Sequence, residues 1–211
     1  MSSQTWLKML RQQRAIAVIR AQSWEQGCEM AKAVAAGGMK LIEITWNSDR
    51  PEKIISYLRQ ELADCQIGSG TLLNLEQLER AIDSGAEFLF TPHTDLTLIQ
   101  TAVKANIPIV PGALSPTEIV TAWQAGATCI KVFPIQSVGG ANYIRSLQGP
   151  LGNIPLIPTG GVTLKNAREF LLAGAIAVGL AGDLFPQNLI KKSDWQAISR
   201  NAQNLMQQIQ D

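Results

Sequence analysis

Three charged side chains stand in chain segments that otherwise read as buried strands. Arg20 ends one apolar run, while Glu43 and Lys131 lie in the middle of runs 41–45 and 129–133. Strands of a parallel sheet that is covered by helices are normally apolar throughout. Burying an unpaired ammonium or carboxylate group costs several kcal/mol. Such charges are therefore either paired for structural reasons or retained for chemistry.

The alternation of side chains along a strand predicts where these charges point. If Ile42 and Ile44 face the covering helices, Glu43 faces the opposite, inner side. The same alternation turns Lys131 and Arg20 inward. One interpretation is a structural ion pair between Glu43 and Lys131. The other is a reactive pair, which we favour because both residues lie near the carboxyl ends of their strands.

The chemistry available to a buried lysine is specific. Desolvation lowers the pKa of the amine, and the neutral amine can attack a carbonyl carbon to give a Schiff base. The Schiff base withdraws electrons while a C–C bond is broken or formed, and a nearby carboxylate can move the protons. Lys131 and Glu43 would together supply this chemistry, and the sequence implies no metal or organic cofactor for it.

The elements that must position this pair repeat along the chain. Short apolar runs rich in Ile and Val alternate with longer amphipathic stretches, and the runs begin near residues 15, 40, 66, 87, 107, 128, 154 and 175. Their mean spacing of about 23 residues fits one strand, one helix and two loops. Eight such units predict a (β/α)₈ barrel, with an open doubly wound sheet as the alternative.

The ends of the chain complete this architecture. Residues 4–13 are expected to form a helix ahead of the first strand, and an amphipathic helix is expected over about 194–210. No linker or low-complexity tract interrupts the chain, which predicts a single domain spanning 1–211.

Composition excludes several classes of protein. The 211 residues carry 18 Lys and Arg against 17 Asp and Glu, a formal net charge of +1, and 46% are hydrophobic. This balance argues against a nucleic-acid partner and against a polybasic membrane anchor. The longest apolar stretch, 170–182, is too short to cross a bilayer, and residues 1–10 lack an apolar signal core.

Cysteine and histidine content limits the possible metal and disulfide sites. Cys28, Cys65 and Cys129 are far apart, and His93 is the single histidine. An odd number of cysteines without a Cys-x-x-Cys pair supports neither a disulfide framework nor a zinc site. We expect reduced thiols and a cytoplasmic location.

Glycines follow the seventh and eighth predicted strands, in segments 158–163 and 179–183. Barrels often bind phosphate at these two loops, through backbone N–H groups and a short helix N-terminus. Asp183 complicates this prediction, because a carboxylate repels a phosphate unless it points away or caps a helix.

Six segments together resemble the 2-keto-3-deoxy-6-phosphogluconate (KDPG) / 4-hydroxy-2-oxoglutarate aldolases, which are class I Schiff-base enzymes with a (β/α)₈ fold. The resemblance runs from about residue 14 to residue 184. The segments that carry it are 17–20 (AVIR), 42–45 (IEIT), 68–71 (GSGT), 91–93 (TPH), 130–134 (IKVFP) and 158–161 (PTGG).

The resemblance implies a role for each matching residue. Lys131 would form the Schiff base, and Glu43 would be the general acid and base. Thr71 would donate to the pyruvyl carboxylate, Phe133 would pack near the pyruvyl carbons, and Pro92 would wall the pocket. The phosphate end of the substrate would be held by Thr159, Gly160 and Gly161. Gly182 and Asp183 are further candidate substrate-binding residues.

The chain departs from the family at two positions. Many members carry an arginine four residues after the catalytic glutamate, where this chain has Asn47, and Arg20 could supply that charge for the substrate carboxylate. Asp183 stands where other members have a serine. Asn47 with Asp183 looks more like the 6-phosphogalactonate branch of the family. His93 stays outside the predicted catalytic set.

The implied reaction is cleavage of KDPG to pyruvate and glyceraldehyde 3-phosphate by a homotrimeric enzyme. Two other substrates remain open, 2-keto-3-deoxy-6-phosphogalactonate and the unphosphorylated 4-hydroxy-2-oxoglutarate. A different class of protein also remains open: a non-catalytic barrel that binds a phosphorylated ligand, in which Lys131 and Glu43 form only an ion pair.

Overall fold

The structure is a computed structural model that describes residues 3–210, and each predicted apolar run contributes to its strands. The strands are β1 (Ala15–Ile19), β2 (Leu41–Thr45), β3 (Gln66–Gly70), β4 (Leu89–Phe90), β5 (Ile109–Val110), β6 (Gly112–Ala113), β7 (Ile130–Val132), β8 (Leu156–Pro158) and β9 (Val178–Leu180).

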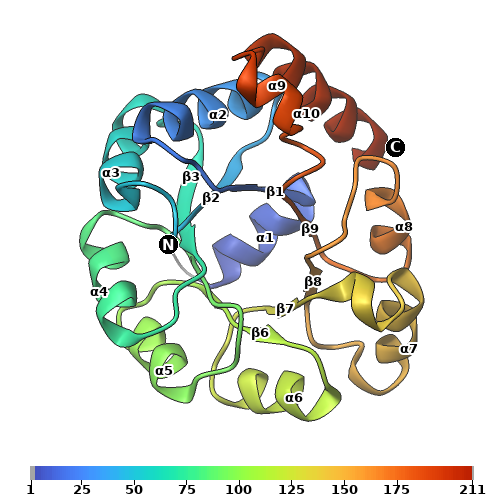
Figure 1. The fold of residues 1–211 in the computed structure, drawn as a ribbon. Helices are drawn as coiled ribbons and strands as arrows, with labels where there is room; N and C mark the ends of the chain where they lie inside the picture. Colours follow the sequence, from blue (N-terminus) through green and yellow to red (C-terminus); the bar gives the residue numbers. More distant parts are fainter. Residues whose placement is uncertain (1–2, 211) are drawn as a thin grey trace.

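Helices alternate with these strands along the chain. They are α1 (Ser3–Gln13), α2 (Trp24–Ala36), α3 (Pro51–Glu61), α4 (Leu75–Asp83), α5 (Leu96–Lys104), α6 (Pro116–Gln124), α7 (Ala141–Leu151), α8 (Ala167–Leu172), α9 (Gln187–Lys191) and α10 (Trp195–Gln210), with a 3₁₀ turn, η1 (Ile135–Val138). Figure 1 shows the strands at the centre and helices around them. The predicted first and last helices are both present.

The strands form a curled parallel sheet in two parts. One part has the order β5-β4-β3-β2-β1-β9 and the other the order β6-β7-β8. Pro111 divides the fifth apolar run into β5 and β6. Neighbours in the run from β1 to β5 are consecutive in sequence, whereas a doubly wound sheet reverses its order at a switch point. The alternative of an open doubly wound sheet is therefore wrong for this part.

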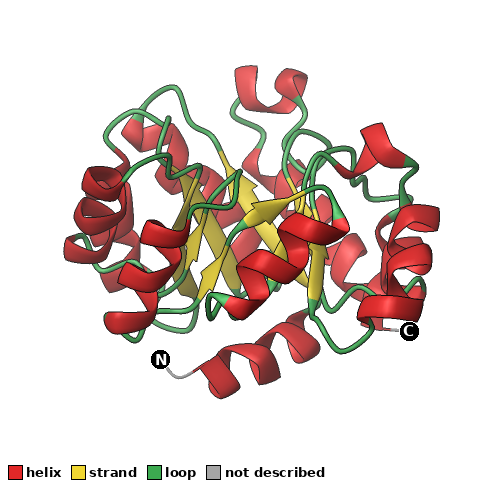
Figure 2. Ribbon diagram, turned by 90° about the horizontal axis from the view of Figure 1, so that it is seen from below, coloured by secondary structure: helices red, strands yellow, loops and turns green. Residues whose placement is uncertain are grey.

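Two apolar layers lie on opposite sides of the strands. Ile42 and Ile44 belong to a large buried cluster that includes helix residues, as predicted. A second cluster on the inner side includes Trp6, Leu10 and Phe88. The Trp6 ring stacks on Phe88 with ring centroids 4.5 Å apart. Helix α1 thus covers the amino ends of the strands (Figure 2), which leaves the carboxyl ends for a site.

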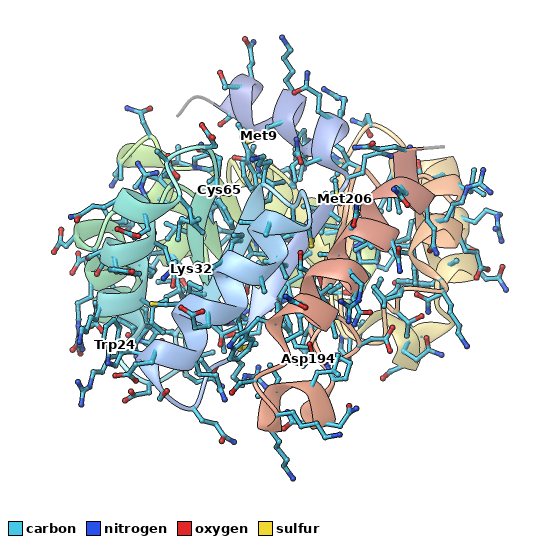
Figure 3. The ribbon with its side chains drawn as sticks, turned by 90° about the horizontal axis from the view of Figure 1, so that it is seen from above. Met9, Trp24, Lys32, Cys65, Asp194 and Met206 are labelled. Atoms are coloured by element: carbon cyan, nitrogen blue, oxygen red, sulfur yellow. The ribbon has the colours of Figure 1, made fainter. Side chains whose placement is uncertain are left out.

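Local hydrogen bonds mark the starts of several helices. The Ser23 side chain accepts from the Gln26 N–H, and Ser115 forms a reciprocal capping box with Glu118. Helix α10 begins one residue later than predicted, because Asp194 caps it by accepting from Ala197 N–H. Figure 3 shows α10 beside α2 on the outer surface. No helix within residues 3–210 has the length and apolarity needed to cross a membrane.

Candidate active site

Glu43 and Lys131 both lie on the inner side of the sheet and are almost fully buried. Their exposed fractions are 1% and 5%. Within the described residues they form no ion pair at 4.0 Å or closer, and Glu43 Oε1 is buried without a hydrogen-bond partner. A structural ion pair would place the two charges in direct contact. The arrangement instead leaves both groups free to react with a third molecule.

The electrostatic surroundings move both groups toward their neutral forms. Burial lowers the pKa of the Lys131 amine; the nearby Glu43 carboxylate opposes this shift, and the Arg20 charge adds to it. Burial raises the pKa of the Glu43 carboxyl, which the positive charges of Lys131 and Arg20 partly offset. A lysine in such a setting supplies the neutral amine that attack on a carbonyl requires, and the carboxyl can both give and accept a proton.

The raised pKa of Glu43 predicts how stability depends on pH. The folded state binds this proton more tightly than the unfolded chain, whose carboxyl has the ordinary pKa of 4.5. That contribution is fully present below pH 4.5 and is lost as pH rises through the folded pKa. The Glu43→Gln protein lacks this titration, so its melting temperature should rise relative to the parent as pH increases. Thermal unfolding of both proteins between about pH 4 and pH 8 measures the difference. A difference that stays constant over this range would contradict the prediction.

Phe133 connects the lysine to the loop after β8. The Lys131 amine lies 4.7 Å from the centre of the Phe133 ring. A side-chain carbon at Gly160 would come within 3.0 Å of the same ring. Gly160 has φ +86°, a conformation that favours glycine, so both its backbone and its lack of a side chain suit this close approach. The predicted residues Lys131, Phe133 and Gly160 are therefore brought together.

The predicted phosphate loops present unpaired backbone donors. Within the described part of the chain, the N–H groups of Gly161, Gly182 and Asp183 donate to no protein acceptor. The Thr159 side chain is buried, and Thr159 bridges to Gly179. Free N–H groups of glycine-rich loops are the usual partners of a phosphate.

Asp183 is engaged in holding these loops together. Its Oδ2 accepts a hydrogen bond of 2.7 Å from the backbone N–H of Leu164 in the loop after β8. The carboxylate thus ties that loop to the loop after β9. The sequence left open whether Asp183 points away or caps a helix, and the structure shows a bond between loops instead.

Arg20 and Asn47, which the sequence linked through the missing family arginine, meet in space. Arg20 Nε donates to Asn47 Oδ1 at 3.2 Å. Both side chains are exposed at the carboxyl ends of β1 and β2. The Arg20 guanidinium therefore lies within hydrogen-bond reach of position 47, and Asn47 orients it.

A cavity with a volume of about 270 Å³ opens beside Arg20. It shares Arg20 and Gly182 with the predicted site residues, but Lys131 and Glu43 do not line it, so it lies next to this pair rather than around it. Its lining residues are Val18, Arg20, Gln22, Gln26, Met30, Thr45, Ala181, Gly182, Phe185, Gln187 and Ile190. Sequence reasoning missed the three glutamines, whereas Thr45 could have been found because it shares the inward face with Glu43.

Thr71 and Pro92 lie at the ends of the neighbouring strands. Thr71 follows β3 directly and has φ +59°, which is strained for a residue with a side chain. The backbone of Pro92 lies against Gly112, whose register partner is Lys131. Both predicted residues are half-buried next to the strands that carry the pair. His93, in the same loop, is half-buried as well.

Comparisons with known proteins agree with this geometry. The family model described as KDPG and KHG aldolase matches residues 7–201. The chain is 32% identical to the 2-dehydro-3-deoxy-phosphogluconate aldolase of Dickeya dadantii over 87% of this chain and 86% of that one. It is also 32% identical to the enzyme of the same name from Haemophilus influenzae, over 94% of both chains.

Solved structures extend the likeness to the fold. A KDPG aldolase from Legionella pneumophila, with pyruvate captured as a covalent carbinolamine intermediate, superposes with a TM-score of 0.87 at 27% identity, covering 94% of this chain and 97% of that one. A structure described as native KDPGal has a TM-score of 0.81 at 30% identity, covering 92% and 96%. By its sequence, its fold and its buried lysine and glutamate, this chain belongs to the KDPG and KHG aldolase family.

Proposed function

We propose that this protein is a class I aldolase, a lyase that cleaves 2-keto-3-deoxy-6-phosphogluconate to pyruvate and glyceraldehyde 3-phosphate. The observation that carries the proposal is the pair of buried, mutually unpaired groups on the inner side of the sheet, Lys131 and Glu43. The carbinolamine that the Legionella relative forms with pyruvate supports the same chemistry.

The first half of the reaction builds the Schiff base. The neutral amine of Lys131 attacks C2 of the keto acid, and one proton of the resulting ammonium moves, directly or through a water, to the former carbonyl oxygen, which gives a neutral carbinolamine. Glu43, protonated, delivers a proton to that hydroxyl, which leaves as water and forms the iminium ion. The raised pKa of Glu43 and the lowered pKa of Lys131 supply the two protonation states that this step requires.

The second half breaks the C–C bond. The Glu43 carboxylate, directly or through a water, removes the proton of the C4 hydroxyl. The C3–C4 bond then breaks, glyceraldehyde 3-phosphate leaves, and the bonding electrons move into the iminium to form an enamine. Protonation of the enamine at C3 and hydrolysis of the resulting iminium release pyruvate and restore the Lys131 amine.

The remaining residues are assigned to substrate binding. Arg20 and Thr71 would hold the carboxylate, while Phe133 and Pro92 would enclose the pyruvyl carbons. The loops after β8 and β9 would bind the phosphate through Thr159, Gly160, Gly161, Gly182 and Asp183. Support comes from the free N–H groups in these loops and from the bond between Asp183 and Leu164, which directs that carboxylate to a protein partner.

The phosphate assignment predicts a strong preference for phosphorylated substrates. We expect kcat/KM for KDPG to exceed that for 2-keto-3-deoxygluconate by at least about 100-fold, since the loop donors would otherwise stay unpaired. Steady-state pyruvate release from both compounds measures this ratio. Equal values would contradict a phosphate site and favour 4-hydroxy-2-oxoglutarate. Faster cleavage of the 6-phosphogalactonate epimer would favour the branch of the family that Asn47 with Asp183 resembles.

We propose that the two parts of the sheet close into a (β/α)₈ barrel that forms one domain over residues 1–211. Two observations support closure. Lys131 N–H donates to Pro111 O, where β5 continues into β6, and Thr159 bridges to Gly179 between β8 and β9. Helix α1 would then plug the amino end of the barrel.

We further propose a homotrimer in the cytoplasm. Leu73, Leu75 and Leu96, which follow β3 and β4, are exposed large apolar side chains and would suit a subunit contact. The three cysteines are free and buried, which fits a reducing compartment.

A further inference from the structure

Strand β3 presents bare backbone to the inner side of the sheet at two successive inward positions, Gly68 and Gly70. A side-chain carbon at Gly68 would overlap the Phe88 ring. A side-chain carbon at Gly70 would overlap the Glu43 carboxylate and lie 2.8 Å from Glu43 Cγ. The Glu43 side chain from β2 and the Phe88 side chain, which directly precedes β4, therefore occupy the space that β3 leaves open.

The strand register shows which way the Glu43 side chain runs. Glu43 is paired with Gly68, and Thr45 is paired with Gly70. A carboxylate that lies against Gly70 therefore points along the strand direction, toward the carboxyl ends of the strands. The Phe88 ring fills the space beside Gly68. The shape of the interior thus directs the carboxylate toward the open end.

Among the described residues, no hydrogen bond holds Glu43 Oε1 in place. Glu43 Oε1 is buried and has no partner among the described residues, and it is the atom that a side chain at Gly70 would overlap. Its position is consequently determined by contact with the β3 backbone rather than by polar bonds. A carboxylate held in this way keeps its lone pairs available for a substrate proton.

We propose that Gly70 is a positioning residue, whose missing side chain holds the Glu43 carboxylate at the height where it exchanges protons with the bound substrate. The inference rests on the proposed function only for the role of Glu43 in proton transfer. The contact between Gly70 and Glu43 stands independently of it. Misplacing a catalytic group by about 1 Å can cost about 100-fold in rate.

A double-mutant cycle tests the contact. Gly70→Ala should lower kcat by about 100-fold, because the new methyl group displaces the carboxylate. Glu43→Asp withdraws the carboxylate by one methylene group and also lowers kcat. The Glu43→Asp, Gly70→Ala protein should be no slower than Glu43→Asp alone, since the shortened side chain leaves room for the methyl group.

Two further measurements separate positioning from general damage to β3. The limb of the pH–rate profile that reports Glu43 should move to lower pH in Gly70→Ala, because a displaced carboxylate gains water and its pKa falls. Ser69→Ala is the matched control on the opposite face of the same strand, where the hydroxyl donates to Ile44 O at 3.2 Å. This variant should keep the parent pH–rate profile.

Melting temperatures give a readout that does not depend on catalysis. If Gly70→Ala is unstable or fails to fold, Glu43→Ala, Gly70→Ala should recover the stability of Glu43→Ala, since nothing remains for the methyl group to overlap. Additive losses of stability and of kcat would overturn the contact itself. In another outcome, the two substitutions affect the melting temperature non-additively but lower kcat additively. That result would overturn the proton-transfer role of Glu43, and with it the catalytic part of the inference.

Discussion

The Lys131→Met protein is expected to lose aldol cleavage by about 10⁴-fold or more in kcat, the scale of loss seen when a covalent nucleophile is removed. Methionine is similar in length and apolar, so it can fill the buried position of Lys131 without an ammonium group. Borohydride reduction in the presence of pyruvate, followed by peptide mass mapping, should place the adduct on Lys131 of the parent protein. The variant should form no adduct.

The matched control is Lys104→Met, which removes an exposed lysine in the last turn of α5. It should retain parent activity and the parent adduct, while circular dichroism should show both variants folded. An adduct on a different lysine, or cleavage within about 100-fold of the parent in Lys131→Met, would exclude Lys131 as the nucleophile. The non-catalytic, ligand-binding alternative would then become the leading interpretation.

The Glu43→Gln protein is expected to keep the reactive amine but to lose about 10² to 10⁴-fold in kcat, the range that general acid–base catalysis contributes. Glutamine has nearly the same shape as glutamate, and it cannot give up and regain a proton as the carboxyl does. Pyruvate should still be trapped on Lys131 by borohydride, although more slowly, because dehydration of the carbinolamine loses its acid. Single-turnover kinetics of cleavage and of trapping measure the two effects separately.

Glu76→Gln provides the control, since the Glu76 side chain is 77% exposed and pairs with Arg80 on the outer surface. It should leave both rates at parent values. A Glu43→Gln protein with parent kcat would show that the carboxyl moves no proton in the slow step. A complete loss of trapping would instead mean that the variant disturbs Lys131 itself.

The sequence alone determined which faces of the strands carry chemistry. The alternation around Glu43 and Lys131 placed both groups inward, and Ile42 and Ile44 are indeed packed in the outer cluster with helix residues. The helix caps at Ser23 and Ser115 follow from equally local patterns. These features depend on residues at most four positions apart, so local periodicity and local hydrogen bonding suffice to predict them.

Contacts between strands were decided only by the tertiary structure. The bond from Arg20 to Asn47 and the bond from Leu164 N–H to Asp183 join residues 27 and 19 positions apart in sequence. Arg20, Asn47 and Asp183 had been singled out in the sequence, but composition and spacing give no distance between the atoms. Such contacts follow from the register between neighbouring strands and from the path of loops, which the whole packed core sets.

The same reason explains why the reacting residues could be predicted from the sequence while the shape of the site could not. Lys131, Glu43 and the glycine loops were identifiable because charge in an apolar strand and clustered glycines are unusual locally. The contact of Gly70 with Glu43, the placement of Trp6 on Phe88 and the cavity beside Arg20 require side chains from separate elements to fill one volume. Close packing makes each of those positions depend on all its neighbours, so the sequence determines the reacting groups and the tertiary structure determines where they stand.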